Sequence, residues 1–170
     1  LISVFSKVGL ELVLKTLKSF DISLISTGGT EKFITELGYE VEAVENLTGY
    51  PSILDGRVKT LHPKIFGGIL AKRNSKENLK EVSSHQIPLI DLLIVDLYPF
   101  EQTVLSNASD EEIIEKIDIG GISLIRAAAK NFKDILCISD KNDYKELNEI
   151  LINNQGCSDL DIRKKFARKV

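Results

Sequence analysis

The stretch ISLISTGGTEKFITELG, residues 22–38, decides the fold. It opens with an apolar run of strand length at 22–26 and passes through two glycines into a segment with helical spacing of apolar residues, 33–37. Thr30 is expected to cap this helix at its start, and Gly38 supplies the left-handed residue that ends it. The stretch therefore predicts a strand, a tight turn and a helix in that order.

The same alternation runs through the rest of the chain. Strands are expected at 1–5, 41–44, 68–71, 90–95 and 135–138, and helices at 10–20, 76–84, 110–116, 122–129, 144–152 and 161–170. Strands that alternate with helices form a mainly parallel sheet with helices on both faces, which is an α/β fold. We therefore predict one α/β domain over residues 1–170, with ligands bound at the carboxyl ends of its strands.

Composition excludes several classes of function. Basic and acidic side chains number 22 and 25, so no broad positive surface is expected and nucleic acid is not a predicted partner. Apolar runs are too short to span a membrane, and the amino end lacks the form of a signal peptide. Cys137 and Cys157 stand far apart without other ligands nearby, which indicates neither a metal site nor a disulfide. We expect a cytoplasmic domain, cut from a longer chain because methionine is not its first residue.

The turn STGGT, residues 26–30, leaves a strand and enters a helix. Its glycines allow a sharp bend that points free amide groups at an anion, so the turn is a candidate phosphate site. A plain strand-to-helix turn is an equally good interpretation. Lys7 follows the first strand, so its side chain should lie at the same edge of the sheet as the glycine turn. A lone lysine at such a place is more often a solvated side chain.

The segment GRVKTLHP, residues 56–63, lies in the long stretch 46–66 that lacks clear periodicity, and loops of this length usually persist for function. Alternation places Arg57 and Lys59 on one side of an extended backbone. There the guanidinium can hold phosphate while the ammonium stabilises a developing oxyanion. The alternative is a solvated basic turn. His62 is expected to be a hydrogen-bonded scaffold residue, not a catalytic one.

The segment DIGG, residues 118–121, runs into an apolar helix that should be largely buried. Arg126 and Lys130 nevertheless share one stripe of that helix with Ser123, so both cations should face an anion or a carboxylate. Asp118 is the obvious protein carboxylate, or else a simple helix cap. Tyr98 follows the apolar strand 90–95. Its hydroxyl could reach the ligand-binding crevice at the carboxyl ends of the strands, or it could simply be the solvent-exposed end of a core side chain.

Five segments in register carry a resemblance to a known family. They are TGGT at 27–30, GRVKTLHP at 56–63, LYPF at 97–100, DIGG at 118–121 and RAAAKN at 126–131. Together they resemble the amino-terminal domain of the bifunctional AICAR transformylase/IMP cyclohydrolase family. The resemblance covers essentially the whole chain and implies a methylglyoxal-synthase-like α/β fold.

The resemblance implies an enzyme that closes the last purine ring. Its substrate is FAICAR, a phosphoribosylated formamide, its product is IMP, and no metal or other cofactor takes part. The matching catalytic positions are Lys59, Tyr98, Asp118 and Lys130. The matching substrate-binding positions are Ser6, Lys7, Thr27, Gly28, Gly29, Thr30, Arg57, Lys59, Thr60, Leu61, Asp96, Leu97, Asp118, Ile119, Gly120 and Gly121.

The chain also departs from the family pattern. The family usually has Ser-Val-Ser-Asp-Lys where residues 3–7 are Ser-Val-Phe-Ser-Lys, and asparagine often stands at the position of Asp96. The transformylase domain that would follow is absent from this chain. By the resemblance that domain is the partner in the full-length protein, and the family forms homodimers.

A rival interpretation from another class is a regulatory module that senses a nucleotide or another phosphorylated metabolite, because methylglyoxal-synthase-like domains also serve in that role. Such a module would use the glycine turn and Arg57 in the same way. It would not need an acid and two cations beside the base end of its ligand. Methylglyoxal synthase itself shares the fold, but the five segments point away from it.

Overall fold

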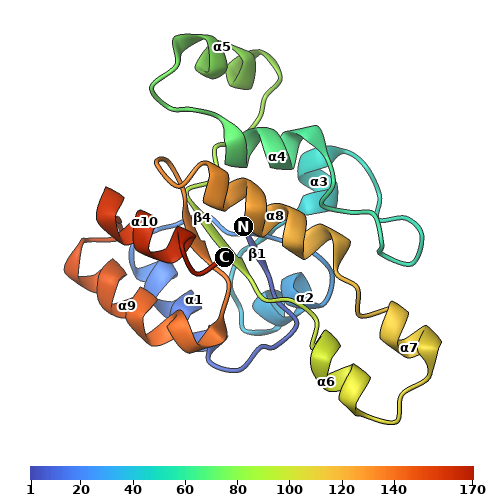
Figure 1. The fold of residues 1–170 in the computed structure, drawn as a ribbon. Coiled ribbons are helices and arrows are strands. Elements are labelled where there is room, and N and C mark those ends of the chain that lie inside the picture. The colour runs from blue at the N-terminus through green and yellow to red at the C-terminus, as the bar shows by residue number, and fades with distance from the viewer.

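The computed structural model describes residues 1–170 and contains one five-stranded sheet in the order β3-β2-β1-β4-β5. Every neighbouring pair is parallel. The strands are β1 (Ile2–Ser3), β2 (Ile25–Ser26), β3 (Glu42–Ala43), β4 (Leu92–Val95) and β5 (Leu136–Ile138). The prediction of a parallel α/β sheet is confirmed, and Figure 1 shows β1 and β4 at its centre.

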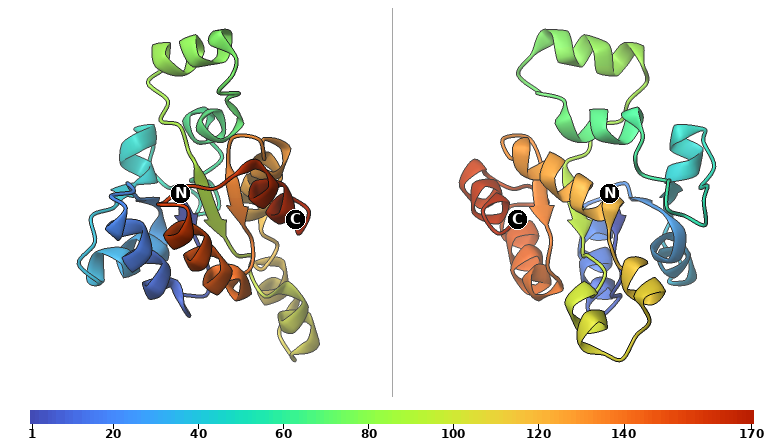
Figure 2. Two further views of the ribbon diagram at one scale, coloured as in Figure 1. Left: turned by 90° about the vertical axis from the view of Figure 1, so that its left-hand side faces the viewer. Right: turned by 45° about the vertical axis from the view of Figure 1, so that its right-hand side comes forward.

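Helices cover both faces of the sheet (Figures 1 and 2). Their bounds are α1 (Leu10–Ser19), α2 (Gly28–Glu36), α3 (Val44–Thr48), α4 (Pro63–Leu70), α5 (Lys76–Ser84), α6 (Phe100–Leu105), α7 (Asp110–Ile114), α8 (Ile119–Lys130), α9 (Tyr144–Asn153) and α10 (Leu160–Ala167). A short 3₁₀ turn, η1 (Lys141–Asp143), precedes α9.

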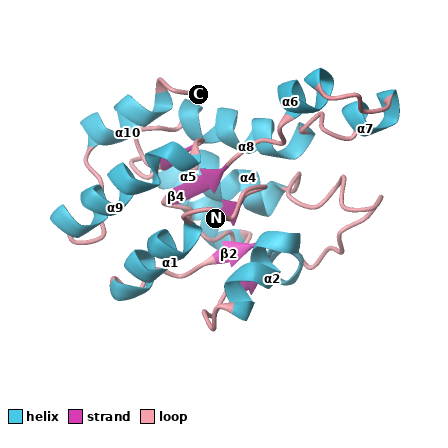
Figure 3. Cartoon of the chain, turned by 90° about the horizontal axis from the view of Figure 1, so that it is seen from below, coloured by secondary structure: helices cyan, strands magenta, loops and turns pink.

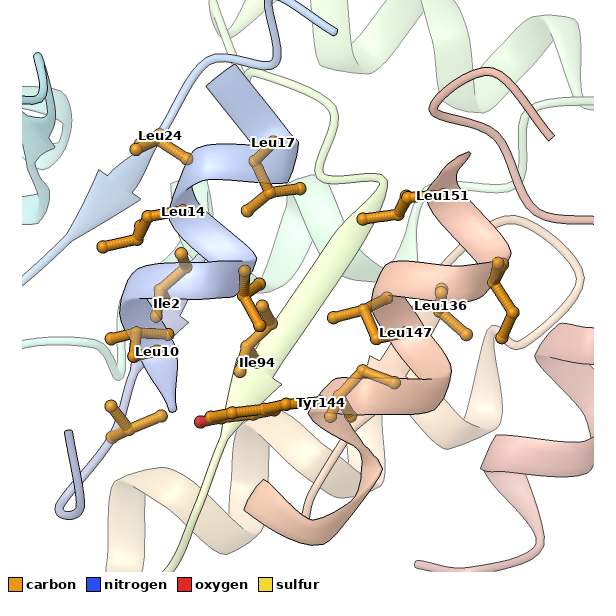
Figure 4. Packing of buried hydrophobic residues seen from close by; sticks show 14 of the residues in the cluster. Ile2, Leu10, Leu14, Leu17, Leu24, Ile94, Leu136, Tyr144, Leu147 and Leu151 are labelled. Atoms are coloured by element: carbon orange, nitrogen blue, oxygen red, sulfur yellow. The ribbon is translucent and has the colours of Figure 1, made fainter. Parts of the chain in front are cut away.

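Two apolar cores form because successive strand residues point to opposite faces. In β4, Ile94 packs with residues of α1 and α9, whereas Leu93 and Val95 pack with residues of α4 and α8. Figure 4 shows the first core, where Leu14 of α1 and Leu147 of α9 lie on the side of Ile94. Full burial of each such side chain stabilises the fold by about 1.5–3 kcal/mol. These cores fix the sheet, and with it the loops at its carboxyl end.

Two segments project at the carboxyl end of the strands, where a ligand of this fold class is expected. One is the loop between α3 and α4, and the other is the arm formed by α6 and α7. Figure 3, which views the chain from below, shows both segments extending on the same side of the molecule. Neither α6 nor α7 contains a buried residue. Figure 2 shows the arm at the opposite end of the molecule from α5.

The structure corrects several expected elements. Residues 68–71 belong mainly to the helix α4 and not to a strand, because Pro63 starts that helix and the buried pair Ile65 and Ile69 has helical spacing. The short helices α3 and α6 were not predicted, since neither is long enough to show a period. The cap of α2 is Thr27 and not Thr30.

No helix of the structure combines the length and the apolar character needed to cross a membrane.

Candidate functional site

A cleft of about 520 Å³ lies at the carboxyl end of the sheet. Its walls come from the loops after β1, β2 and β4, from residues 55–60, and from the segment that joins α7 to α8. Most predicted site residues line this cleft: Lys7, Thr27, Gly29, Thr30, Arg57, Lys59, Thr60, Asp96, Tyr98, Asp118, Ile119, Gly120 and Gly121. Residues as far apart in sequence as Lys7 and Gly121 are thereby gathered at one place.

The glycine turn forms the cleft wall at the start of α2. Gly28 has φ +57°, a left-handed conformation that glycine adopts without strain. The amides of the first helical turn have no partner within the helix, so this end of α2 can receive an anion. The buried Thr27 hydroxyl donates to Oε1 of Glu45 at 3.1 Å. The buried Thr30 hydroxyl donates to the Val4 carbonyl oxygen at 2.9 Å, which ties α2 to the end of β1.

The basic loop faces the glycine turn. A backbone bridge between Ile53 and Val58 closes a tight reversal, and Arg57 forms an ion pair with Glu115. The ammonium of Lys59 makes no hydrogen bond or ion pair within the chain, and its Nζ lies 3.4 Å from the point where a Cβ on Gly28 would stand. Lys59 is therefore an unpaired cation beside the glycine turn, which is the candidate phosphate site.

The amino end of α8 supplies the carboxylate of the cleft. Asp118 caps the helix, and its Oδ1 accepts a hydrogen bond from the Gly121 amide at 2.6 Å. A Cβ on Gly121 would lie 2.5 Å from Oδ2 of Asp118, so only glycine permits this close approach. Thr60, which is 4% exposed, lies beside Gly120. Asp118 is thus the helix cap, one of the two interpretations left open by the sequence, and its carboxylate lines the cleft but pairs with neither Arg126 nor Lys130.

Asp96 and Lys7 organise the loop after β1. The Asp96 carboxylate accepts hydrogen bonds from the Phe5 amide and, at 3.0 Å, from the Ser6 amide. The Lys7 ammonium donates to the carbonyl oxygens of Val4 and Phe5. Burial lowers the pKa of Lys7, and the nearby Lys59 lowers it further, while Asp96 opposes the shift. Two ammonium groups therefore approach each other in the cleft, as an anion site requires.

Tyr98 stands where the segment after β4 meets the cleft. Partial burial raises the pKa of its phenol, and the negative charges of Asp118 and Glu115 raise it further. The neutral phenol is consequently the stable form at neutral pH. In that form it can both donate and accept a hydrogen bond.

Several predicted residues lie outside the cleft lining. Leu61 and Leu97 are each 40% exposed, and Ser6 contributes its amide to the contact with Asp96. Gly28 borders the cleft only through its approach to Lys59. Lys130 ends α8, whose other end carries Asp118, so the rise of the helix places their backbones about 18 Å apart.

The prediction that Arg126 and Lys130 face a carboxylate is wrong. Both side chains are exposed, and no ion pair of the structure includes either of them. Helical spacing correctly placed them on one stripe, but that stripe faces solvent, where neither charge needs a partner. His62 was expected to be a scaffold residue, and its ring Nδ1 accepts from the Lys64 amide at 3.2 Å to cap α4.

Sequence reasoning missed several groups at this site, among them Phe5 and Glu115. Phe5 lines the cleft, and Glu115 holds Arg57 across 58 positions of sequence. The departure of Phe5 from the family pattern was its only signal. No group of three or more His, Cys, Asp or Glu side chains is arranged to hold a metal ion.

A larger cavity of about 1120 Å³ lies at the opposite, amino end of the strands. It is bordered by Leu1, Ile22 and Leu92, and one of its charged groups, Arg73, is paired with Asp91. None of the predicted site residues lines it. The larger cavity is therefore not the candidate site, and we assign the site to the smaller cleft because most of the predicted site residues gather there, with the unpaired ammonium of Lys59 beside the glycine turn.

Comparison with known proteins bears on this assignment. The family model described as the MGS-like domain matches residues 9–123. The chain belongs to the MGS-like domain family. The crystal structure of ForH superposes on this MGS-like domain with a TM-score of 0.83 at 32% identity, covering 99% of this chain and 86% of that one. The predicted fold class is thereby confirmed.

Curated relatives of this MGS-like domain are named bifunctional purine biosynthesis protein PurH. The protein from Bacteroides thetaiotaomicron is 53% identical over 169 residues, and that from Bradyrhizobium diazoefficiens is 48% identical over 169 residues. Each alignment covers 99% of this chain, which spans only about a third of the length of these relatives, 33% and 32%. The resemblance identified from the five sequence segments is confirmed.

Proposed function

We propose that this MGS-like domain is an IMP cyclohydrolase that acts in purine biosynthesis, closing FAICAR to IMP with loss of water. The names of the relatives support the purine role. The single observation that carries the finer proposal is that Lys59, Tyr98 and Asp118 line one cleft together with residues of the glycine turn. A sensor of phosphorylated metabolites would need the turn but not the acid–base groups.

The phosphate end of the substrate is assigned to the start of α2. Free amides of the first turn, together with Lys7 and Arg57, provide donors and positive charge for a phosphate. Anchoring the sugar phosphate here would direct the base toward the start of α8, on the facing wall of the cleft.

Ring closure requires mainly orientation, because both reacting groups belong to one molecule. Holding the carboxamide and formamide groups in one plane removes the entropic cost of orienting them, a contribution on the order of several kcal/mol. A cleft with rigid walls suits this task. Asp118 is fixed by its bond to the Gly121 amide, and Tyr98 lines the same cleft.

The chemical step forms the bond between the carboxamide nitrogen and the formyl carbon and breaks the bond from that carbon to the formyl oxygen. Two protons from the reacting nitrogens leave with the oxygen as one molecule of water. In this proposal the unpaired Lys59 ammonium stabilises charge on the oxygen and protonates it as it departs. Asp118 accepts a nitrogen proton, and the neutral Tyr98 phenol relays or donates one.

Lys130 keeps a catalytic role only as an expectation from the resemblance. Its position at the far end of α8 favours Lys59 as the cation of the cleft. Replacing each lysine separately by alanine decides between them.

By the same resemblance we propose that the full-length protein carries a transformylase domain, forms a homodimer and works in the cytoplasm. The relatives have about three times the length of this chain, which leaves room for a second catalytic unit. Sedimentation of the full-length protein tests the dimer.

An absorbance assay with synthetic FAICAR and this isolated domain tests the function directly. The expected result is conversion to IMP by the wild-type domain and loss of turnover in folded Lys59→Ala and Asp118→Ala proteins. Binding of IMP without any turnover would favour the sensor instead. Unchanged turnover in both variants would remove the catalytic assignment.

A further inference from the structure

An aromatic pair stands at the rim of the cleft. The ring of Phe5, in the loop after β1, meets the ring of Tyr98 edge to face, with centroids 5.6 Å apart and planes at 78°. This geometry is the favourable one for aromatic quadrupoles. The backbone of Phe5 is held in place by the Asp96 carboxylate, which accepts its amide. The ring of Phe5 therefore has a fixed support from which to contact Tyr98.

A cation completes the cluster. Lys116 lies in the segment between α7 and α8, and its Nζ is 5.5 Å from the Tyr98 ring centroid and 5.6 Å from that of Phe5. Both distances fall within the range of a cation–π contact. Lys116 forms no ion pair, whereas its neighbour Glu115 is paired with Arg57. Its ammonium therefore lies over both rings, and the nearby carboxylate of Glu112 also interacts with it.

Ordinary core packing does not explain this arrangement. Phe5 is 49% and Tyr98 39% exposed, so neither ring belongs to either apolar core. The three side chains come from three separate segments that converge only at the cleft.

We propose that Phe5 and Lys116 are positioning residues for Tyr98: they fix the plane of its ring so that the phenol oxygen is presented to the cleft beside Asp118. By simple Coulomb attraction, a positive charge 5.5 Å from the ring centroid favours negative charge on the phenol oxygen, whereas burial and the carboxylates of Asp118 and Glu115 raise the pKa of the phenol. The orientation part of the proposal stands on geometry alone, while its kinetic part rests on the proposed cyclohydrolase function.

Orientation is measured without any assay of activity. The chain has four tyrosines, so NMR of ring-labelled tyrosine gives few signals, and the Tyr98→Phe spectrum assigns the one of interest. Phe5→Leu, which keeps an apolar side chain but removes the ring, should shift the Tyr98 signals and leave the other three in place. Phe5→Tyr should restore them. Phe100→Leu is the matched control, because Phe100 is similarly exposed at 41% but has no aromatic contact.

The charge is tested separately with Lys116→Met, which keeps the aliphatic chain and removes the ammonium. Lys133→Met, at an exposed position beside the amino-end cavity, is its control. We expect Phe5→Leu and Lys116→Met each to lower kcat about 3- to 10-fold with KM unchanged, the size of one aromatic or cation–π contact. In Lys116→Met the alkaline limb of the pH–rate profile should move to higher pH.

Failure of this proposal can be told from failure of the proposed function. A wild-type domain without cyclohydrolase activity would overturn the function, while the NMR shifts would still decide the orientation. Tyr98 signals that stay in place in Phe5→Leu and in Lys116→Met would overturn the positioning role, and so would an active domain whose kcat is unchanged by both substitutions.

Discussion

The two ends of the sheet differ in size and in chemistry. The amino end has the larger cavity, about 1120 Å³ against about 520 Å³. Arg73, a cation of the larger cavity, is paired with Asp91 and also donates to the Ile90 carbonyl oxygen. At the carboxyl end the Lys59 ammonium is unpaired, and its neighbour Lys7 has a lowered pKa. The predicted site residues that gather at the carboxyl end, and not volume, distinguish the end that can do chemistry.

The reason lies in how the chain is connected. Each strand of a parallel sheet ends at the same edge, and the loops that follow are free to carry functional residues because the cores do not constrain them. The glycine turn after β2, the segment after β4 and the start of α8 all meet there. The cleft is built from the parts of the chain that packing leaves free.

The largest expected difference between the two ends of the sheet comes from Lys59→Ala. Removing the unpaired cation of the cleft should lower kcat for FAICAR cyclisation about 10²- to 10³-fold, as for other oxyanion-stabilising groups. Lys133→Ala, at the amino end, should leave kcat unchanged. Steady-state absorbance measurements on the two folded proteins check this.

Lys130→Ala adds a further contrast within the same experiment. Because Lys130 lies at the far end of α8, we expect a much smaller loss than for Lys59→Ala. An equal loss would show that Lys130 reaches the reacting atoms and would break the assignment of the cation role to Lys59 alone.

The next effect concerns the cap of α8. In Gly121→Ala the new methyl group would clash with the Asp118 carboxylate 2.5 Å away, so the cap and the cleft carboxylate are both displaced. We expect a loss of about 1–2 kcal/mol in the free energy of unfolding and a fall in kcat. Urea denaturation measures the first quantity. Gly29→Ala, where a Cβ meets nothing within 4 Å, should leave the stability unchanged.

A smaller effect is expected from Asp96→Ala. The change leaves the Phe5 and Ser6 amides without their partner and frees the loop after β1. Because these amides are partly open to water, the loss should lie near the lower end of about 1–3 kcal/mol. Affinity for IMP should fall as well. Titration calorimetry that gives wild-type affinity would contradict the role of Asp96 in holding this loop.

Sequence reasoning recovered the sheet because its strands are apolar runs with a clear alternation of faces, as in residues 92–95. It failed at 68–71, where four apolar or small residues fit either a strand or the last turn of a helix. Only the start signal at Pro63 and the pair Ile65 and Ile69 distinguish the two. Short runs do not contain enough turns to reveal a period.

The site was predicted in part for a related reason. Segments such as the glycine turn and the residues around Asp118 carry local signals, and they do line one cleft. Helical spacing gave the stripe of Arg126 and Lys130 but not the direction in which it faces. The ion pair of Arg57 with Glu115 and the ring contact of Phe5 with Tyr98 join distant segments, and no local pattern marks such contacts.

The smallest predicted effect is on the pH dependence of stability. The pKa of Tyr98 is raised in the folded chain, so the neutral phenol is favoured by folding. Its contribution is complete below the ordinary tyrosine pKa of about 10 and is lost as the pH rises through the higher folded value. Tyr98→Phe should therefore lose less stability between neutral and strongly alkaline pH than the wild type. Tyr50→Phe, at an exposed loop position, is the control.

The most direct test of the central claim is an NMR titration of the ¹⁵N-labelled domain with IMP. The amide signals that shift should be those of the carboxyl-end cleft, above all Gly29, Lys59 and Gly121. Shifts confined to the amino-end cavity, for example at Ser23, Glu40 and Ser158, would contradict the assignment of the site.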